Sequence, residues 1–259
     1  MNKTKQYLES RENILSIYFM SEYPQKNTTQ EIIKSLSDSG VDMIEIGMPF
    51  SDPLADGPVI QHSSKIALEN GFTIDQMFSD IKAVHKEAQS PLVLMGYFNM
   101  VMAYGMERFL KQCKEVAIDA VILPDLPPEI YEERYKDLFE TYGVSLVFLI
   151  TPQTSTERLN YINKLSKSFI YAVADNSITG TKEGFSDNQL AYFERLRKHN
   201  FDVPVVIGFG ISDKQSYTEA CKYANGVIIG SAFIKAIEQS KILSATVPKF
   251  IESIRELPN

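Results

Sequence analysis

Eight short apolar segments, each followed by residues with helical periodicity, constrain the fold of this 259-residue chain most strongly. The apolar segments are rich in β-branched and aromatic residues and are bounded by Gly, Pro, Asp or Asn, as strands are. They lie at residues 14–20, 42–46, 92–97, 119–123, 145–150, 169–173, 203–207 and 226–229. The helix-like segments lie near residues 28–39, 59–70, 74–88, 106–117, 128–141, 155–166, 187–199, 213–222, 231–239 and 245–256. This alternation predicts an α/β protein with a parallel sheet.

A closed barrel and an open doubly wound sheet both alternate strands with helices. The open sheet usually carries a glycine-rich turn after its first strand, but residues 18–24 (Tyr-Phe-Met-Ser-Glu-Tyr-Pro) contain no glycine. The chain length is close to the roughly 250 residues of a typical (β/α)8 barrel. No linker or low-complexity tract divides the chain. We therefore predict a single (β/α)8 TIM-barrel domain over residues 1–259, with extra helices.

Charge and composition indicate which partners and which cellular compartment suit this chain. With 26 basic and 33 acidic side chains, the net charge of −7 disfavours general attraction to nucleic acid or anionic membranes. An anionic substrate must then be held by local backbone donors. The first ten residues lack the apolar core of a signal peptide, and no apolar run approaches the roughly 18 residues of a membrane span. The two cysteines form no disulfide framework, so we expect a cytoplasmic protein.

The second strand segment and the loop after it carry the acidic residues of interest. Side chains alternate along a strand, so Ile44 and Ile46 share one face and Glu45 lies on the other. If the isoleucines face the helices, Glu45 points into the barrel, where poor solvation raises its pKa and suits it to proton transfer. The alternative is a glutamate satisfied by a neighbouring hydroxyl or lysine. The loop also contains Asp56, either a second functional carboxylate at the strand ends or a solvated turn residue.

Glycine turns follow the last two strand segments, where barrels of this type frequently bind phosphate. Small residues there let backbone N–H groups approach an anion, and the second turn opens a helix. Glycines also end strands and cap helices, but two such turns at the two expected places favour phosphate binding. The candidate residues are Gly208, Phe209, Gly210, Gly230, Ser231 and Ala232.

Three further segments carry expectations. Residues 175–186, with Thr179 and Gly180, form either a lid over the substrate or a plain surface loop, and Gly180 is a further phosphate donor. Tyr97 either lines the pocket or belongs to the core. Residues 98–104 are unusually apolar for a loop, which indicates a covered helix entry or a partner surface. The three histidines show no ligand spacing, so we expect no metal site.

The acidic loop, read with the later motifs, resembles the tryptophan synthase α subunit family. Residues 45–58 (Glu-Ile-Gly-Met-Pro-Phe-Ser-Asp-Pro-Leu-Ala-Asp-Gly-Pro) match that family's signature nearly residue for residue. The segments 179–180, 208–212 and 230–232 match further motifs in order, and the similarity covers essentially the whole chain. The resemblance implies a lyase that cleaves indole-3-glycerol phosphate to indole and glyceraldehyde 3-phosphate without metal or organic cofactor. It also implies a β subunit partner, which holds pyridoxal phosphate, in an α2β2 heterotetramer.

The resemblance also implies roles for individual residues. Glu45 matches the general acid–base, Asp56 the carboxylate that stabilises the indole nitrogen, and Thr179 the lid residue that helps to position Asp56. Tyr97 and Tyr171 match pocket positions. The remaining matches fall in the phosphate-binding segments, namely Gly180, Gly208, Phe209, Gly210, Gly230, Ser231 and Ala232.

This chain departs from the family pattern in two places. Glu22 stands before Tyr23-Pro24, where the family usually has a glycine. Without that glycine, the loop after the first strand is not expected to keep the family's geometry automatically. Residues 174–180 read Ala-Asp-Asn-Ser-Ile-Thr-Gly, where the family commonly has an Arg or other polar residue and a Gly before Val-Thr-Gly. This difference bears on how the lid closes and communicates with the partner.

Other functions remain as alternatives at this stage. One is another phosphate-binding barrel, such as indole-3-glycerol phosphate synthase or a ribose-phosphate isomerase, although the acidic loop argues against it. A second is a lyase that needs no partner. A third is a catalytically weak module that activates a β subunit through its apolar loop, which the two intact carboxylates disfavour.

Overall fold

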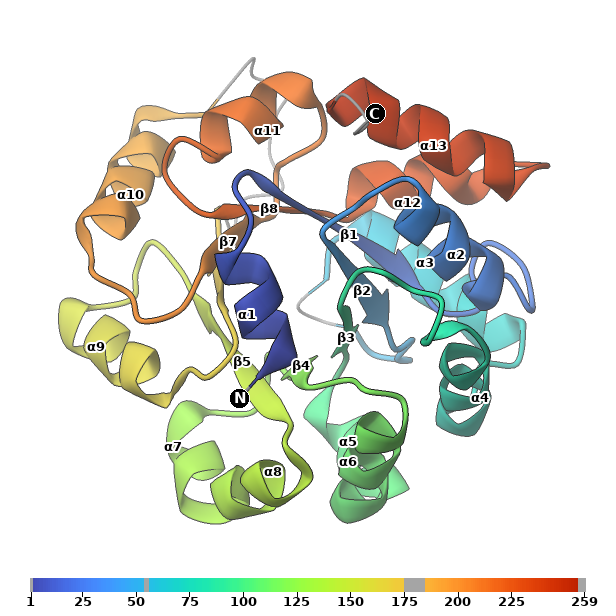
Figure 1. Ribbon diagram of the computed structural model, residues 1–259, viewed down its shortest axis with the longest axis horizontal. Helices are drawn as coiled ribbons and strands as arrows, with labels where there is room; N and C mark the ends of the chain where they lie inside the picture. Colours follow the sequence, from blue (N-terminus) through green and yellow to red (C-terminus); the bar gives the residue numbers. More distant parts are fainter. Residues whose placement is uncertain (1, 54–55, 175–184, 256–259) are drawn as a thin grey trace.

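The computed structural model describes residues 2–53, 56–174 and 185–255, and these form a closed barrel of eight parallel strands. Each strand pairs with its neighbours in chain order, and β8 pairs with β1 to close the ring (Figure 1). The strands are β1 Ile14–Met20, β2 Met43–Gly47, β3 Leu92–Met95, β4 Ala120–Ile122, β5 Ser145–Ile150, β6 Ile170–Val173, β7 Val205–Gly208 and β8 Gly226–Ile229. The predicted barrel and its eight strand segments are confirmed.

Most of the helices surround the barrel, and α1 lies across its opening (Figure 1). Those that the periodicity predicts are α2 Thr29–Asp38, α3 Pro58–Glu69, α4 Ile74–Val84, α6 Met106–Glu115, α9 Thr156–Leu165, α10 Asp187–Lys198, α11 Lys214–Ala220, α12 Ser231–Glu238 and α13 Leu243–Ile254. The predicted segment 128–141 contains α7 Pro128–Ile130, a π-helical turn η1 Tyr131–Tyr135 and α8 Lys136–Tyr142. Two helices were not predicted as such: α1 Lys3–Glu9 and α5 Phe98–Tyr104.

The apolar segment 98–104 is therefore mostly a covered helix. Val101 is fully buried, and Phe98 packs edge-on against Tyr135 at a centroid distance of 5.4 Å. Met102 is the exposed large hydrophobic residue of α5. The Asp125 carboxylate, at the end of the neighbouring strand β4, accepts a hydrogen bond from the first N–H of this helix, that of Phe98 (2.8 Å). A tertiary contact thus fixes the start of α5.

Strand alternation sorts the core into two layers. Outward-facing aliphatic residues such as Ile44 and Ile46 pack fully buried beneath the helices. Cross-strand register then identifies the inward row, because partners on adjacent parallel strands point the same way. Tyr18 is level with Glu45, and Glu45 is level with Val93. The barrel interior at this level is lined by the side chains of Tyr18, Glu45 and Val93.

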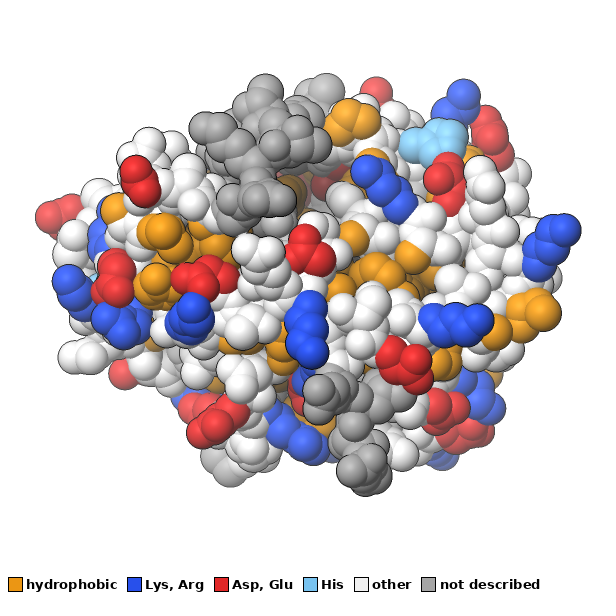
Figure 2. Space-filling model, turned by 90° about the horizontal axis from the view of Figure 1, so that it is seen from above, with side chains coloured by type: hydrophobic (Ala, Val, Ile, Leu, Met, Phe, Trp, Pro, Cys, Tyr) orange, Lys and Arg blue, Asp and Glu red, His pale blue; other side chains and the backbone are white. Residues whose placement is uncertain are grey.

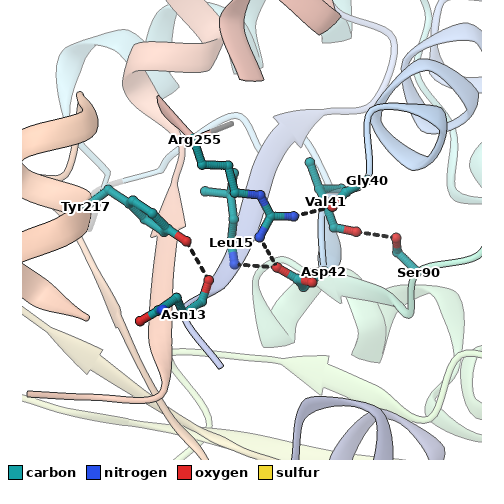
Figure 3. A network of polar contacts seen from close by, with 8 residues as sticks. All are labelled: Asn13, Leu15, Gly40, Val41, Asp42, Ser90, Tyr217 and Arg255. Carbon is teal, nitrogen blue, oxygen red and sulfur yellow. Dashed lines mark hydrogen bonds and ion pairs between the residues drawn. The ribbon is translucent and has the colours of Figure 1, made fainter. Parts of the chain in front are cut away.

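A polar network ties the last helix to the amino-terminal ends of the first two strands (Figure 3). Arg255 follows α13, and its guanidinium donates to the Asp42 carboxylate (Nη1 to Oδ2, 2.5 Å) and to the Gly40 carbonyl. The same carboxylate accepts from the Leu15 N–H (2.8 Å). Nearby, the Tyr217 hydroxyl donates to the Asn13 carbonyl (2.6 Å). This network holds the first and last parts of the barrel together.

The surface carries its charges mixed. On the side shown in Figure 2, basic and acidic side chains are interspersed, with hydrophobic side chains in small groups between them. No described helix is both long and apolar enough to cross a membrane.

Candidate active site

Glu45 lies inside the barrel. Its side chain is fully buried, and its charge raises the pKa of Tyr171, which is on β6 and not on a neighbouring strand. Because β2 and β6 do not pair, this electrostatic effect acts across the barrel interior. The inward orientation predicted from the alternation in β2 is confirmed.

The surroundings of Glu45 suit a proton-transfer group. Among the described residues neither carboxyl oxygen has a hydrogen-bond partner. Burial raises the pKa of Glu45 from its ordinary value of 4.5 to about 8, because the charged form loses its hydration. The carboxyl group is therefore mainly protonated at neutral pH and close to its titration point. The alternative of a glutamate satisfied by a lysine or a hydroxyl finds no partner in the part of the chain that the structure describes.

Asp56 acts on the same tyrosines as Glu45, because, beyond the effect of burial, the charges of both carboxyl groups raise the pKa of Tyr18 and Tyr171. Its carboxylate also has a hydrogen-bond donor. The Tyr97 hydroxyl donates to its Oδ2 at 3.1 Å. Burial raises the pKa of Asp56, while the Tyr97 hydrogen bond opposes the rise by stabilising the ionised form. The backbone beside it is held as well, since the Asp56 carbonyl accepts from the Gln61 side chain (2.8 Å). Asp56 is thus a partly buried, positioned carboxylate and not a freely solvated turn residue.

Two tyrosines proposed from the sequence as pocket residues line the same space. Tyr97 directly precedes α5 and stacks on Phe50 with ring centroids 4.9 Å apart. Tyr171 is buried, and a methyl group at Gly208 would overlap its ring, so the ring lies directly over the end of β7. Burial, followed by the charge of Glu45, raises the pKa of Tyr171 well above its usual value. Tyr97 thus contacts Asp56, and the charges of Glu45 and Asp56 both act on Tyr171.

The two glycine turns lie side by side. Strands β7 and β8 pair in parallel, with Ile207 level with Val227, so both turns leave the same end of the barrel. Phe209 and Gly210 have φ values of +67° and +79°, a left-handed turn that exposes the Phe209 ring. The second turn, from Gly230, opens α12, whose first residues have no side-chain cap. Uncapped N–H groups and the positive end of a helix form a site for an anion.

Glu22 shows how the chain compensates for a missing glycine. Its φ of +63° is in the left-handed region, the conformation that glycine adopts at no steric cost. The buried carboxylate accepts hydrogen bonds from the Asn27 N–H (2.8 Å) and the Thr29 hydroxyl (3.1 Å). The Glu22 N–H in turn donates to the same hydroxyl (3.0 Å). The side chain thus holds the turn in a glycine-like shape, and α2 begins beside it.

Some expectations fall outside the described residues, and one site residue was missed. Thr179, Gly180 and most of the lid expected over residues 175–186 fall in the segment 175–184, outside the described ranges, so the lid and its departure from the family pattern stay predictions. Sequence reasoning overlooked Tyr18, which faces the interior level with Glu45. The alternation of side chains that predicted the direction of Glu45 could also have identified Tyr18, because alternation along residues 14–20 places Tyr18 on the inward face of its strand.

Comparisons with known proteins point to one family. A family model described as tryptophan synthase alpha chain matches residues 4–257. Tryptophan synthase alpha chains from Flavobacterium psychrophilum and Flavobacterium johnsoniae are 50% and 49% identical, over 98% of this chain and 100% of each relative. Among solved structures, tryptophan synthase subunit alpha from Legionella pneumophila superposes with a TM-score of 0.88 at 31% identity, covering 99% of this chain and 98% of that one. A chain of the Pyrococcus furiosus tryptophan synthase α2β2 complex superposes with a TM-score of 0.84 at 30% identity, covering 94% of this chain and 98% of that one.

Proposed function

The chain belongs to the tryptophan synthase alpha chain family, and we propose that Glu45 and Asp56 carry the reaction of that family in this protein. The reaction is the cleavage of indole-3-glycerol phosphate to indole and glyceraldehyde 3-phosphate, a step of tryptophan biosynthesis. The chain is accordingly a lyase. The single observation that carries the assignment of residues is the buried carboxyl group of Glu45, which has no hydrogen-bond partner among the described residues.

Glu45 transfers protons in both directions. Its protonated carboxyl group donates a proton to C3 of the indole ring, which leaves positive charge on the ring nitrogen. The resulting carboxylate then removes the proton from the hydroxyl on the carbon bonded to C3. The carbonyl of glyceraldehyde 3-phosphate forms, the bond to C3 breaks, and its electron pair restores the aromatic indole. A pKa of about 8 makes both transfers accessible near neutral pH.

Asp56 stabilises the charge that develops in the first step. A fixed anion near the ring nitrogen lowers the energy of the protonated intermediate, and it acts strongly because the site excludes water. The Tyr97 hydroxyl supports this role by donating to Oδ2 and favouring the ionised carboxylate. Tyr97 and Tyr171 are proposed to enclose the indole ring and its chain.

The adjacent glycine turns are proposed to hold the phosphate. The residues are Gly208, Phe209, Gly210, Gly230, Ser231 and Ala232, and the supporting features are the paired strand ends and the uncapped start of α12. Anchoring a remote group supplies binding energy that orients the reacting bond over Glu45. Gly180 as a further phosphate donor and Thr179 as the lid residue that positions Asp56 complete the proposal.

The protein's partner follows from the family. Tryptophan synthase of Pyrococcus furiosus is an α2β2 complex, and this chain is an α subunit that pairs with a β subunit in such a heterotetramer. We propose that residues 1–259 act as one barrel domain, that the location is cytoplasmic, and that the α reaction uses neither metal nor organic cofactor.

The decisive assay measures indole release from indole-3-glycerol phosphate by the purified chain, alone and with a β subunit. We expect Glu45→Gln to abolish turnover while binding of glyceraldehyde 3-phosphate survives, because the phosphate turns are untouched. Glu12→Gln, at an exposed position outside the barrel interior, is the matched control and should retain wild-type activity. Near-normal activity of Glu45→Gln would refute the assigned role. Full activity without a β subunit would instead make the chain a self-sufficient lyase.

A further inference from the structure

Tyr18 is an inward-facing side chain between the two halves of the proposed site. It lies on β1, which pairs with β8 on one side and β2 on the other. The β8 side ends in the proposed phosphate turn at Gly230, and the β2 side carries Glu45. Only 8% of Tyr18 is exposed. Its position makes it the side chain that physically connects the anion site with the acid.

The orientation of the ring follows from the glycines that it touches. A Cβ atom built on Gly230 would lie 3.4 Å from Cδ1 and 3.5 Å from Cβ of Tyr18, which is ordinary contact with the base of the side chain. A Cβ atom built on Gly47 would overlap the hydroxyl and would lie 2.6 Å from Cζ. The ring therefore runs from the phosphate turn to the residue two positions beyond Glu45, with its hydroxyl at the acidic end.

The hydroxyl has a proton to donate. Among the described residues its acceptor is the Met20 thioether at 3.9 Å, and sulfur accepts hydrogen bonds only weakly. Burial, with the charges of Asp56 and Glu45, raises the pKa of Tyr18 well above its usual value. The phenol thus stays neutral and keeps its proton over the whole working pH range. Within the described part of the chain it is a donor without a strong acceptor, in a site proposed to bind a substrate with hydroxyl groups.

We propose that the Tyr18 hydroxyl binds the glycerol chain of the substrate by donating a hydrogen bond to one of its hydroxyl groups. The inference rests on the proposed function and adds a substrate-binding residue to it. With the phosphate at Gly230 and indole C3 at Glu45, the three-carbon chain between them must pass along the Tyr18 ring. The Tyr18 hydroxyl then lies next to the hydroxyl groups of the substrate's glycerol chain.

The test separates hydrogen bonding from packing by using two ligands. One is indole-3-glycerol phosphate, and the other is its analogue in which both chain hydroxyls are replaced by hydrogen. Dissociation constants for both are measured in a Glu45→Gln background, which prevents turnover, with and without Tyr18→Phe. We expect Tyr18→Phe to raise the dissociation constant of indole-3-glycerol phosphate about five- to tenfold, the effect of losing one neutral hydrogen bond. The affinity for the deoxygenated analogue should change less than twofold.

Two controls accompany the measurement. Tyr192→Phe removes another buried tyrosine hydroxyl, one that donates to the Ile150 carbonyl (3.2 Å) outside the site, and should leave both affinities unchanged. Gly47→Ala pushes the Tyr18 hydroxyl aside without removing it and should reproduce the selective loss. An equal loss for both ligands, or no loss for either, would overturn the proposal while leaving the proposed function intact. If the wild-type chain with its β subunit released no indole, the proposed function itself would fail.

Discussion

The buried Glu45 predicts a specific dependence of stability on pH. The unfolded carboxyl group titrates near 4.5 and the folded one at about 8. Below pH 4.5 the carboxyl group is protonated in both the folded and the unfolded state, so Glu45 does not make the free energy of unfolding depend on pH. Between the two values the folded state binds more protons than the unfolded state, and the free energy of unfolding therefore falls as pH rises. Above pH 8 both states are ionised and the loss is complete.

The magnitude follows from the size of the shift. One pKa unit corresponds to about 1.4 kcal/mol, and a rise from 4.5 to about 8 therefore costs about 5 kcal/mol above pH 8. At pH 7 the cost is about 3 kcal/mol. This is a large part of the roughly 5–15 kcal/mol that stabilises a typical domain. The acid that the reaction needs is thus kept at a measurable expense in folding free energy.

Urea unfolding of the wild type and Glu45→Gln between pH 5 and pH 8 measures this cost. Glutamine cannot ionise, so its own burial adds a constant that does not change with pH. We expect the variant to gain about 3–4 kcal/mol relative to the wild type from pH 5 to pH 8. The exposed Glu12→Gln variant should follow the wild-type curve throughout. Curves for Glu45→Gln and wild type that stay parallel within about 0.5 kcal/mol would refute the reasoning.

Three further changes test other contacts. Asp56→Asn should lower turnover about 100-fold or more with an unchanged urea midpoint, whereas a loss of stability would make Asp56 a structural turn residue. Tyr97→Phe removes the donor to Asp56, so the pKa of Asp56 should rise and the acidic limb of the pH–rate profile should move to higher pH; an unmoved limb would contradict the role of that bond. Arg255→Ala leaves the buried Asp42 carboxylate without its cation and should cost about 3 kcal/mol in urea unfolding. A cost below about 1 kcal/mol would rank the pair with surface ion pairs.

The sequence predicted the parts of this molecule that follow from local periodicity. The order and approximate positions of the strands came from short apolar runs, with ends that differ from the observed strands by up to two residues. The inward direction of Glu45 came from alternation with Ile44 and Ile46. Both depend only on residues close in the chain. Tyr18 follows the same alternation, but its place in the site depends on the register between β1 and β2. This register pairs Tyr18 with Glu45, which is 27 positions later in the chain. That information is not local.

Contacts between distant residues explain what the sequence did not predict. The first helix, α1, has only seven residues and is held by Asp119, whose carboxylate accepts from the Thr4 N–H (3.2 Å) and the Thr4 hydroxyl. No periodicity over so short a segment indicates a helix, because most of its stability comes from that tertiary contact. The concern about Glu22 had the same origin, since the left-handed turn is held by Asn27 and Thr29.

The network around Arg255 has a practical consequence for work with this protein. Arg255 binds Asp42 just before β2, and at the other end Asn2 donates to the Asp119 carbonyl (2.8 Å) just before β4. Both described ends of the chain are therefore anchored at the rim opposite the carboxyl groups and glycine turns. An affinity tag, a fluorophore or a tether joined near Asn2 or Arg255 is therefore attached at the side of the barrel away from the proposed active site.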